Sequence, residues 1–222
     1  MASTPVLYEA LLWEPSTGYF LLDRHLERLA SSAGFFGYPV DIGAARARLL
    51  EFAQNLGDQP RKVRLEASAT GNVVLEDVDV KATTPLQIAL ATEAIDSSDV
   101  FLCHKTSRRE VYQRALAQHP DADDVLLWNE RHELTETCSA NVVLEIDEQR
   151  LTPPLSSGLL PGTYRAHLLE RGEIEERVLP LASLEHASAI FLINSVRRLW
   201  QGKLASLEPT AQPGDAVAFD LR

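Results

Sequence analysis

Lys105 stands in the stretch FLCHKTSRREVY, where an apolar segment meets a polar cluster. The chain has only three other lysines, Lys62, Lys81 and Lys203, and each lies in a setting typical of a surface charge. A lysine that is removed from water and lies close to other cations loses its proton more easily, so its amine becomes a nucleophile toward a carbonyl carbon. Its position alone is more typical of a solvated lysine ahead of a helix.

Two later segments predict an acid and an anion site. Glu136 lies among small and hydroxylic residues in HELTETCSANVVLE, just before a predicted strand, where a buried carboxylate could serve a ligand. In SSGLLPGTYRAHLLE a Pro-Gly turn leads into a predicted helix, so the amides of Gly162, Thr163 and Tyr164 could converge on an anion. Taken singly, these segments also fit an exposed loop acid and an ordinary helix start.

Further polar groups extend this set. Helical spacing places Arg24 and Arg28 of DRHLERL on one face, where either could meet a phosphate, although exposed helix arginines are the commoner case. FLINSVRRLW adds polar side chains at Asn194 and Ser195. Pyridoxal 5'-phosphate needs a tethering amine, an acid beside its ring nitrogen and a phosphate cup. The combination therefore predicts a pyridoxal phosphate site.

The elements that must position these groups alternate between hairpins and helices. We expect a hairpin over 7–22, a helix with Asp23 as its N-cap that ends at Gly37, a helix over 42–56 and a hairpin over 62–80. After KATTP we expect strands over 86–91, 124–129, 141–146 and 189–196, and helices over 107–118 and 163–172. This order predicts an α+β fold in two domains, residues 1–83 and 84–222.

Composition and charge exclude several classes of function. The net charge of −11 disfavours nucleic-acid and anionic-membrane partners, but it leaves room for an anionic small molecule in a local basic site. The start of the chain has no basic segment ahead of an apolar run, and ASAIFLINSV is too short to span a bilayer. Cys103, Cys138 and the scattered histidines give no disulfide framework or metal spacing. We therefore expect a cytoplasmic protein without a structural metal.

Five ordered blocks resemble the class IV aminotransferases, which are the fold-type IV pyridoxal phosphate enzymes. The blocks are RHLERLASSAGFFGYP, FLCHKTSRREVYQRA, DDVLLWNERHELTETCSANVVLE, TPPLSSGLLPGTYRAHLLERGEI and FLINSVRRLW. The resemblance runs from about residue 8 to 202 and is greatest to 4-amino-4-deoxychorismate lyases, especially the module fused to aminodeoxychorismate synthase component I. Tyr8 and Glu9 match only the end of the opening YGxGxFE-like stretch of stand-alone members. The resemblance implies a D-amino acid aminotransferase-like fold, with a small N-terminal α/β sandwich and a larger barrel-like C-terminal domain.

The resemblance also implies roles for single residues. Lys105 matches the lysine that binds the cofactor aldehyde, and Glu136 matches the acid that keeps the pyridine nitrogen protonated. The phosphate would be bound by residues that match Arg28, by the amides of Thr163 and Tyr164, and by Ser195. Arg64 falls where some members bind the substrate carboxylate. Members of the family are typically homodimers that act on small molecules.

The leading expectation is a lyase that releases pyruvate from 4-amino-4-deoxychorismate and leaves 4-aminobenzoate for folate synthesis. The substrate amine would displace Lys105, which would then act as general base on the carbon that carries this amine. An aminotransferase for branched-chain, D-amino acid or amine substrates would use the same Lys105 and Glu136. A third possibility is a cofactor-free relic of the fold without catalytic function.

Overall fold

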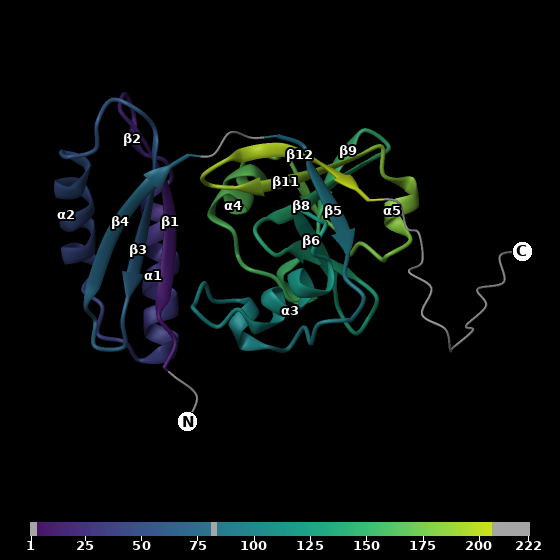
Figure 1. Ribbon diagram of the computed structural model, residues 1–222, viewed down its shortest axis with the longest axis horizontal. Coiled ribbons are helices and arrows are strands. Elements are labelled where there is room, and N and C mark those ends of the chain that lie inside the picture. Colours follow the sequence, from purple (N-terminus) through teal and green to yellow (C-terminus); the bar gives the residue numbers. More distant parts are fainter. Residues whose placement is uncertain (1–3, 81–83, 206–222) are drawn as a thin grey trace, which may run out of the picture.

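The computed structural model describes residues 4–80 and 84–205, which form two β-sheets lying side by side (Figure 1). The first sheet has the strand order β2-β1-β3-β4, and all three of its pairings are antiparallel. Its strands are β1 (Leu7–Glu14), β2 (Gly18–Tyr19), β3 (Arg61–Ala67) and β4 (Val73–Asp79), and it is covered by α1 (Leu22–Phe36) and α2 (Ile42–Ala53). The predicted N-terminal hairpin is thus confirmed, with a second strand of only two residues.

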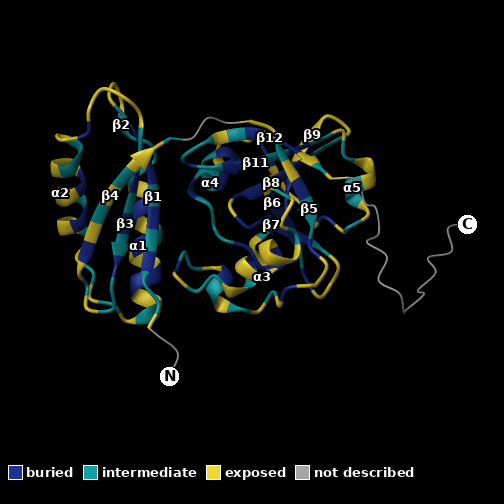
Figure 2. Cartoon of the chain, in the orientation of Figure 1, coloured by how far each residue is buried: buried dark blue, intermediate teal, exposed yellow. Residues whose placement is uncertain are grey.

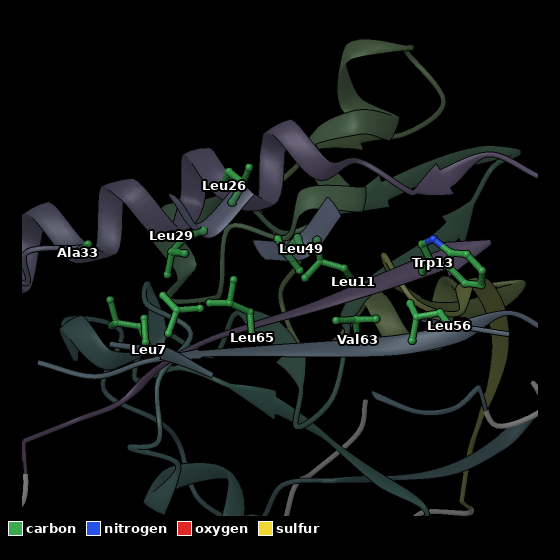
Figure 3. Close-up of a cluster of buried hydrophobic side chains, with 13 residues drawn as sticks. Leu7, Leu11, Trp13, Leu26, Leu29, Ala33, Leu49, Leu56, Val63 and Leu65 are labelled. Atoms are coloured by element: carbon green, nitrogen blue, oxygen red, sulfur yellow. The ribbon is translucent and has the colours of Figure 1, made fainter. Parts of the chain in front are cut away.

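Alternation along the strands builds the core of the first sheet. Every second side chain of β3, beginning with Val63 and Leu65, is buried against the helices. The helices contribute apolar residues at helical spacing, among them Leu26 and Leu29 of α1 and Leu49 of α2. Figure 3 shows these leucines and valines facing one another between α1 and the strands. This apolar layer fixes the position of α1 on the sheet.

The start of α1 differs from the prediction. The N-cap is Leu21, in a left-handed conformation with φ 55°, and Asp23 lies inside the first turn. There its charge suits the positive end of the helix and forms an ion pair with Arg46. The end at Gly37, with φ 69°, agrees with the prediction because glycine adopts this conformation without strain. The second helix ends at Ala53 instead of residue 56.

The second sheet closes into a barrel. Strands β8, β11, β12, β5, β6 and β7 are paired in this order, and a further β8–β7 pairing closes the ring, while β9 and β10 extend it from β8. The bounds are β5 (Leu86–Leu90), β6 (Asp124–Trp128), β7 (Leu134–Thr137), β8 (Asn141–Ile146), β9 (Gln149–Thr152), β10 (Glu175–Glu176), β11 (Ala189–Asn194) and β12 (Arg198–Leu204). The helices of this half are α3 (Glu110–Gln118), α4 (Thr163–Glu170) and α5 (Ser183–His186). The predicted α+β class and the barrel-like sheet are confirmed.

Two neighbouring strands of the barrel, β12 and β5, pack closely at Gly202. At Gly202 of β12 a Cβ atom would lie 2.2 Å from Cδ1 of Ile88 on β5, so a larger residue there would displace the Ile88 side chain. The sequence analysis missed four strands of this sheet: β7, β9 and β10, which have four, four and two residues, and β12, which has seven. Strands of two to four residues show too few alternations to reveal a period.

The proposed domain boundary between residues 83 and 84 adjoins residues 81–83, which lie outside the described residues, and the two-domain division stays a prediction.

One face of α1 contacts the barrel half of the molecule. His25, Arg28 and Ser32 follow helical spacing, one residue behind the apolar stripe that faces the first sheet. Their side chains contact Thr163, the carbonyl of Pro161 and His104, respectively. A single helix therefore connects both halves, with apolar groups on one side and polar groups on the other.

Within residues 4–80 and 84–205, no helix combines the length and the apolar character that crossing a membrane requires. The same residues contain no group of three histidine, cysteine, aspartate or glutamate side chains placed to hold a metal ion.

Two adjacent leucines of α2 test the core. Leu49 is fully buried whereas Leu50 is 51% exposed, and Figure 2 shows buried and exposed positions side by side along this helix. We predict that Leu49→Ala lowers the free energy of unfolding by about 2–5 kcal/mol. Leu50→Ala, the matched control, should change it by no more than about 0.5 kcal/mol. Denaturant unfolding measures both, and equal effects would contradict the packing described.

Candidate active site

A cavity of about 480 Å³ lies between the two halves of the molecule, and residues from both line it. Six of the seven residues predicted to form a site are among those that line it: Arg28, Arg64, Lys105, Glu136, Thr163 and Ser195. These residues span 168 positions of sequence, from residue 28 to residue 195, so the fold alone brings them together. The seventh residue, Tyr164, lies beside this cavity at the start of α4.

Lys105 is positioned by backbone pairing with the first sheet. The amide of Tyr8 donates to the carbonyl oxygen of Lys105 at 2.8 Å, and the amide of Ser107 donates to that of Val6 at 2.9 Å. Burial and the nearby charge of Arg28 lower the pKa of Lys105 to about 8, although acidic neighbours act in the opposite direction. Among the described residues, the Lys105 amine has no hydrogen-bond or ion-pair partner. A lysine in this state is a ready nucleophile near neutral pH.

Glu136 lies on β7 opposite Asn141 of β8. Its Oε1 accepts hydrogen bonds from the Tyr112 hydroxyl at 2.7 Å and the Leu160 amide at 3.2 Å, and its Oε2 accepts from Asn141 Nδ2 at 3.1 Å. Burial raises the pKa of Glu136 to about 7, even though these hydrogen bonds favour the ionised form. The carboxyl group can therefore exchange a proton with a basic nitrogen near neutral pH.

Arg28 is held by an acid that the sequence analysis did not assign to the site. Its Nε and Nη2 donate to Glu9 Oε1 at 2.8 Å and Oε2 at 2.6 Å, and its Nη1 donates to the Pro161 carbonyl at 3.0 Å. Burial would raise the pKa of Glu9, but the charge of Arg28 and the hydrogen bonds from Arg28 and His25 outweigh it and lower the value to about 2. Three of the five guanidinium N–H groups are thus used, and two remain for a ligand.

The start of α4 presents free amides beside the cavity. The first α4 hydrogen bond runs from the amide of Ala166 to the carbonyl of Gly162 at 2.9 Å, which leaves the preceding amides without intrahelical acceptors. Glycine at position 162 lets the start of α4 lie close to Asn141, because a Cβ at this position would lie 1.9 Å from Asn141 Oδ1. The Tyr164 ring packs against Phe20 with centroids 5.8 Å apart, so the phosphate contact predicted for this residue would fall to its amide.

Ser195 and Arg64 lie in different settings within the cavity. Ser195 is buried, and its hydroxyl donates to the Ala10 carbonyl at 3.2 Å, which ties the barrel to β1. The Arg64 guanidinium lies 4.3 Å from the centre of the Tyr8 ring and forms ion pairs with Glu66 and Glu76 at 2.8 and 3.5 Å. Its side chain is 39% exposed, so an incoming carboxylate can reach it.

Two further residues considered in the sequence analysis, Arg24 and Asn194, have other partners. Arg24, the alternative phosphate ligand on α1, forms an ion pair with Glu170 and does not line the cavity. Asn194 lines the cavity, but its Oδ1 accepts from two amides of its own turn. The sequence analysis missed Tyr112 and also Arg109, which donates to the Cys138 carbonyl at 2.6 Å. The signal that could have indicated them is their place in the block FLCHKTSRREVYQRA, which also contains Lys105.

Comparisons with known proteins establish the family. The family model "Amino-transferase class IV" matches residues 6–204. The chain belongs to this family. A Schizosaccharomyces pombe protein named "Putative aminodeoxychorismate lyase" is 32% identical over 209 residues, which make up 89% of this chain and 89% of the relative. The chain is accordingly an enzyme of the class IV aminotransferase family, whose members depend on pyridoxal phosphate.

Solved structures agree on the fold. A "Putative amino-acid aminotransferase" from Mesorhizobium loti is 35% identical, with a TM-score of 0.85 over 91% of this chain and 100% of that one. A "Putative 4-amino-4-deoxychorismate lyase" from Legionella pneumophila is 23% identical, with a TM-score of 0.79 over 90% and 82%. A hypothetical aminotransferase from Mycobacterium tuberculosis, bound to α-ketoglutarate and PMP, is 22% identical, with a TM-score of 0.80 over 90% and 81%. At such identities the last two support the fold alone.

The buried amine of Lys105 generates a stability prediction. In the cofactor-free protein, Lys105→Met should raise the free energy of unfolding by about 1–3 kcal/mol at pH 7, because it removes a buried charge. The pKa of Lys105 is lowered on folding, from 10.5 to about 8, so the wild type regains this stability as the pH rises from about 8 to 10.5. The advantage of the variant should disappear over this range.

Denaturant unfolding at pH 7 and pH 10 measures this difference. Lys203→Met is the control, because the Lys203 side chain is exposed and should give no such difference. A Lys105→Met variant that is less stable than wild type at pH 7 would contradict the burial of an uncompensated amine.

Proposed function

We propose that the chain is a pyridoxal phosphate-dependent lyase that converts 4-amino-4-deoxychorismate to 4-aminobenzoate and pyruvate. The observation that carries the cofactor assignment is the meeting of the Lys105 amine and the Glu136 carboxyl in one cavity beside the start of α4. The name of the Schizosaccharomyces pombe relative supports the lyase reaction. The resemblance of five sequence blocks to the lyase module fused to synthase component I supports the same substrate.

The residues of the cavity fit this cofactor. The unpartnered Lys105 amine can form the covalent link to an aldehyde, and Glu136 can face the ring nitrogen. Thr163, the free amides of α4 and the two remaining N–H groups of Arg28 supply donors for a phosphate. The Ser195 hydroxyl donates to the Ala10 carbonyl, so it would serve a phosphate by turning its hydrogen from that carbonyl to a phosphate oxygen.

The proposed chemistry assigns each residue a task. When bound, pyridoxal phosphate supplies an electron sink for the pair of electrons left when the C–H bond beside the substrate amine breaks. Lys105, released by the incoming substrate amine, removes the proton from that carbon. Glu136 would keep a proton at the ring nitrogen. The substrate C–O bond to the enolpyruvyl group would then break as the electrons of the C–H bond form the last double bond of the aromatic ring, and the departing enolpyruvate would take up a proton to become pyruvate. Arg64, stacked on Tyr8, offers a cation to a substrate carboxylate.

A second candidate is an aminotransferase that acts on branched-chain, D-amino acid or amine substrates. The name of the Mesorhizobium loti structure, at 35% identity, favours it. Lys105 would then return the proton to a carbon of the cofactor, and no group would leave the substrate. A cofactor-free relic is disfavoured, since a buried amine without a partner destabilises the fold and has no use there. Homodimeric assembly and a cytoplasmic location remain parts of this proposal.

Cofactor binding tests the assignment of Lys105. Wild-type protein mixed with pyridoxal phosphate should develop a visible absorption band that persists after gel filtration. Lys105→Ala should abolish the band, whereas Lys203→Ala, at an exposed position, should retain it. A band that is unchanged in Lys105→Ala would contradict the assignment.

The products formed from 4-amino-4-deoxychorismate test the reaction. The proposal predicts equimolar release of pyruvate and 4-aminobenzoate without a second substrate. Glu136→Gln should lower kcat by roughly 10²-fold or more, because the proton at the ring nitrogen is no longer held by an anion. Amino transfer to an oxo acid without pyruvate release would favour the aminotransferase and exclude the lyase.

A further inference from the structure

Three side chains from three elements form a buried chain that ends in the cavity. Glu9 of β1 and His25 of α1 are in contact at 2.6 Å between Oε2 and Nδ1, with side-chain exposures of only 2% and 1%. His25 Nε2 lies 3.3 Å from the hydroxyl oxygen of Thr163, the first residue of α4. Thr163 lines the cavity, so this chain runs from the buried acid to the proposed phosphate cup.

The protons in this chain are fixed by Glu9. With a pKa of about 2, Glu9 is ionised at neutral pH and can only accept a hydrogen bond, so Nδ1 of His25 must carry a proton. A neutral imidazole then has a bare Nε2, which can only accept. The hydroxyl hydrogen of Thr163 must therefore point to His25 and away from the cavity.

An anion in the cavity needs the opposite arrangement. A phosphate oxygen accepts hydrogen bonds, so the Thr163 hydroxyl stabilises it only when its hydrogen points into the cavity. That rotation leaves a neutral Nε2 without a donor in a buried site, which is unfavourable. A protonated Nε2 removes the conflict, because it donates to the Thr163 oxygen and frees the hydroxyl hydrogen.

We propose that His25 takes up a proton from solvent when a phosphate binds against Thr163, and that this proton turns the Thr163 hydroxyl toward the phosphate. The inference rests on the proposed function, since it assumes that a phosphate group occupies the start of α4. His25 is a positioning residue in this scheme. It acts through Thr163, and the proton that it gains forms a new N–H bond at Nε2.

The groups around His25 shift its pKa in opposite directions. Burial lowers the pKa of His25, although the charge of Glu9 and the hydrogen bond to it act in the opposite direction. Arg28 on the same helix and Lys105 on the neighbouring segment lower it further. A phosphate would add negative charge beside Arg28, Lys105 and His25, which favours the imidazolium form of His25.

Binding of pyridoxamine 5'-phosphate measures the coupling, because this ligand cannot form a covalent link with Lys105. Its dissociation constant is measured from pH 6 to 9 for wild type and for Thr163→Val, which keeps the shape but lacks the hydroxyl. The slope of log Kd against pH gives the protons taken up. Wild type should take up between about half and one proton more than Thr163→Val.

Three further variants and one further ligand separate the proposed proton uptake from a purely structural role of His25. Thr163→Ser should restore the extra uptake, and His25→Gln should abolish it. Adding His25→Gln to Thr163→Val should change the slope no further, whereas independent effects would add. Pyridoxamine, which lacks the phosphate, should show no dependence on His25, and His186→Gln is the control at an exposed histidine.

The results that overturn the proposal are distinct from those that overturn the function. Tight binding with the same slope in wild type, Thr163→Val and His25→Gln overturns the role of His25 and leaves the cofactor assignment standing. Wild-type protein that binds neither pyridoxamine 5'-phosphate nor pyridoxal phosphate overturns both.

Discussion

The buried ion pair between Glu9 and Arg28 is the interaction on which the cavity depends. It joins β1 to α1, and the same Arg28 donates to the Pro161 carbonyl in the other half of the molecule. Removing one partner of such a pair leaves an uncompensated buried charge, at a cost of about 3–5 kcal/mol. His25 and Ser32 extend this contact along α1. The apolar stripe fixes the helix on the first sheet, and the polar stripe then determines how that sheet faces the barrel.

The reactive groups of the site are side chains whose charged forms are destabilised by burial. Burial moves the pKa of Lys105 down to about 8 and that of Glu136 up to about 7, so each group is pushed toward its neutral form. In contrast, the low pKa of Glu9 keeps a full negative charge beside Arg28. Acids in similarly buried positions thus differ because one has a bidentate cation and the other has only neutral donors. This difference lets one carboxylate organise the site while the other handles protons.

The sequence was sufficient for the class of fold and for six of the residues that line the cavity, but it did not assign Glu9, Arg109 and Tyr112 to the site. Most of the longer strands and helices showed their periods. Lys105 and Glu136 each fitted an exposed side chain when taken alone, and their roles came from the five ordered blocks that resemble one family. The partners across the cavity were not predictable. Glu9 shares the β1 face of Leu7 and Leu11, and nothing local indicates that Arg28 and His25 meet it there. Short strands such as β7, and a helix start set by Leu21 in place of Asp23, depend on tertiary contacts that a local pattern does not contain.

The central claim is that Lys105 is the residue that links the chain to its cofactor. Reduction of the pyridoxal phosphate-loaded protein with borohydride makes such a link permanent, and mass spectrometry of peptides then identifies the modified lysine. The account predicts that the pyridoxyl group is found on Lys105, in a stoichiometric amount. A label on Lys62, Lys81 or Lys203, or no label at all, would contradict it.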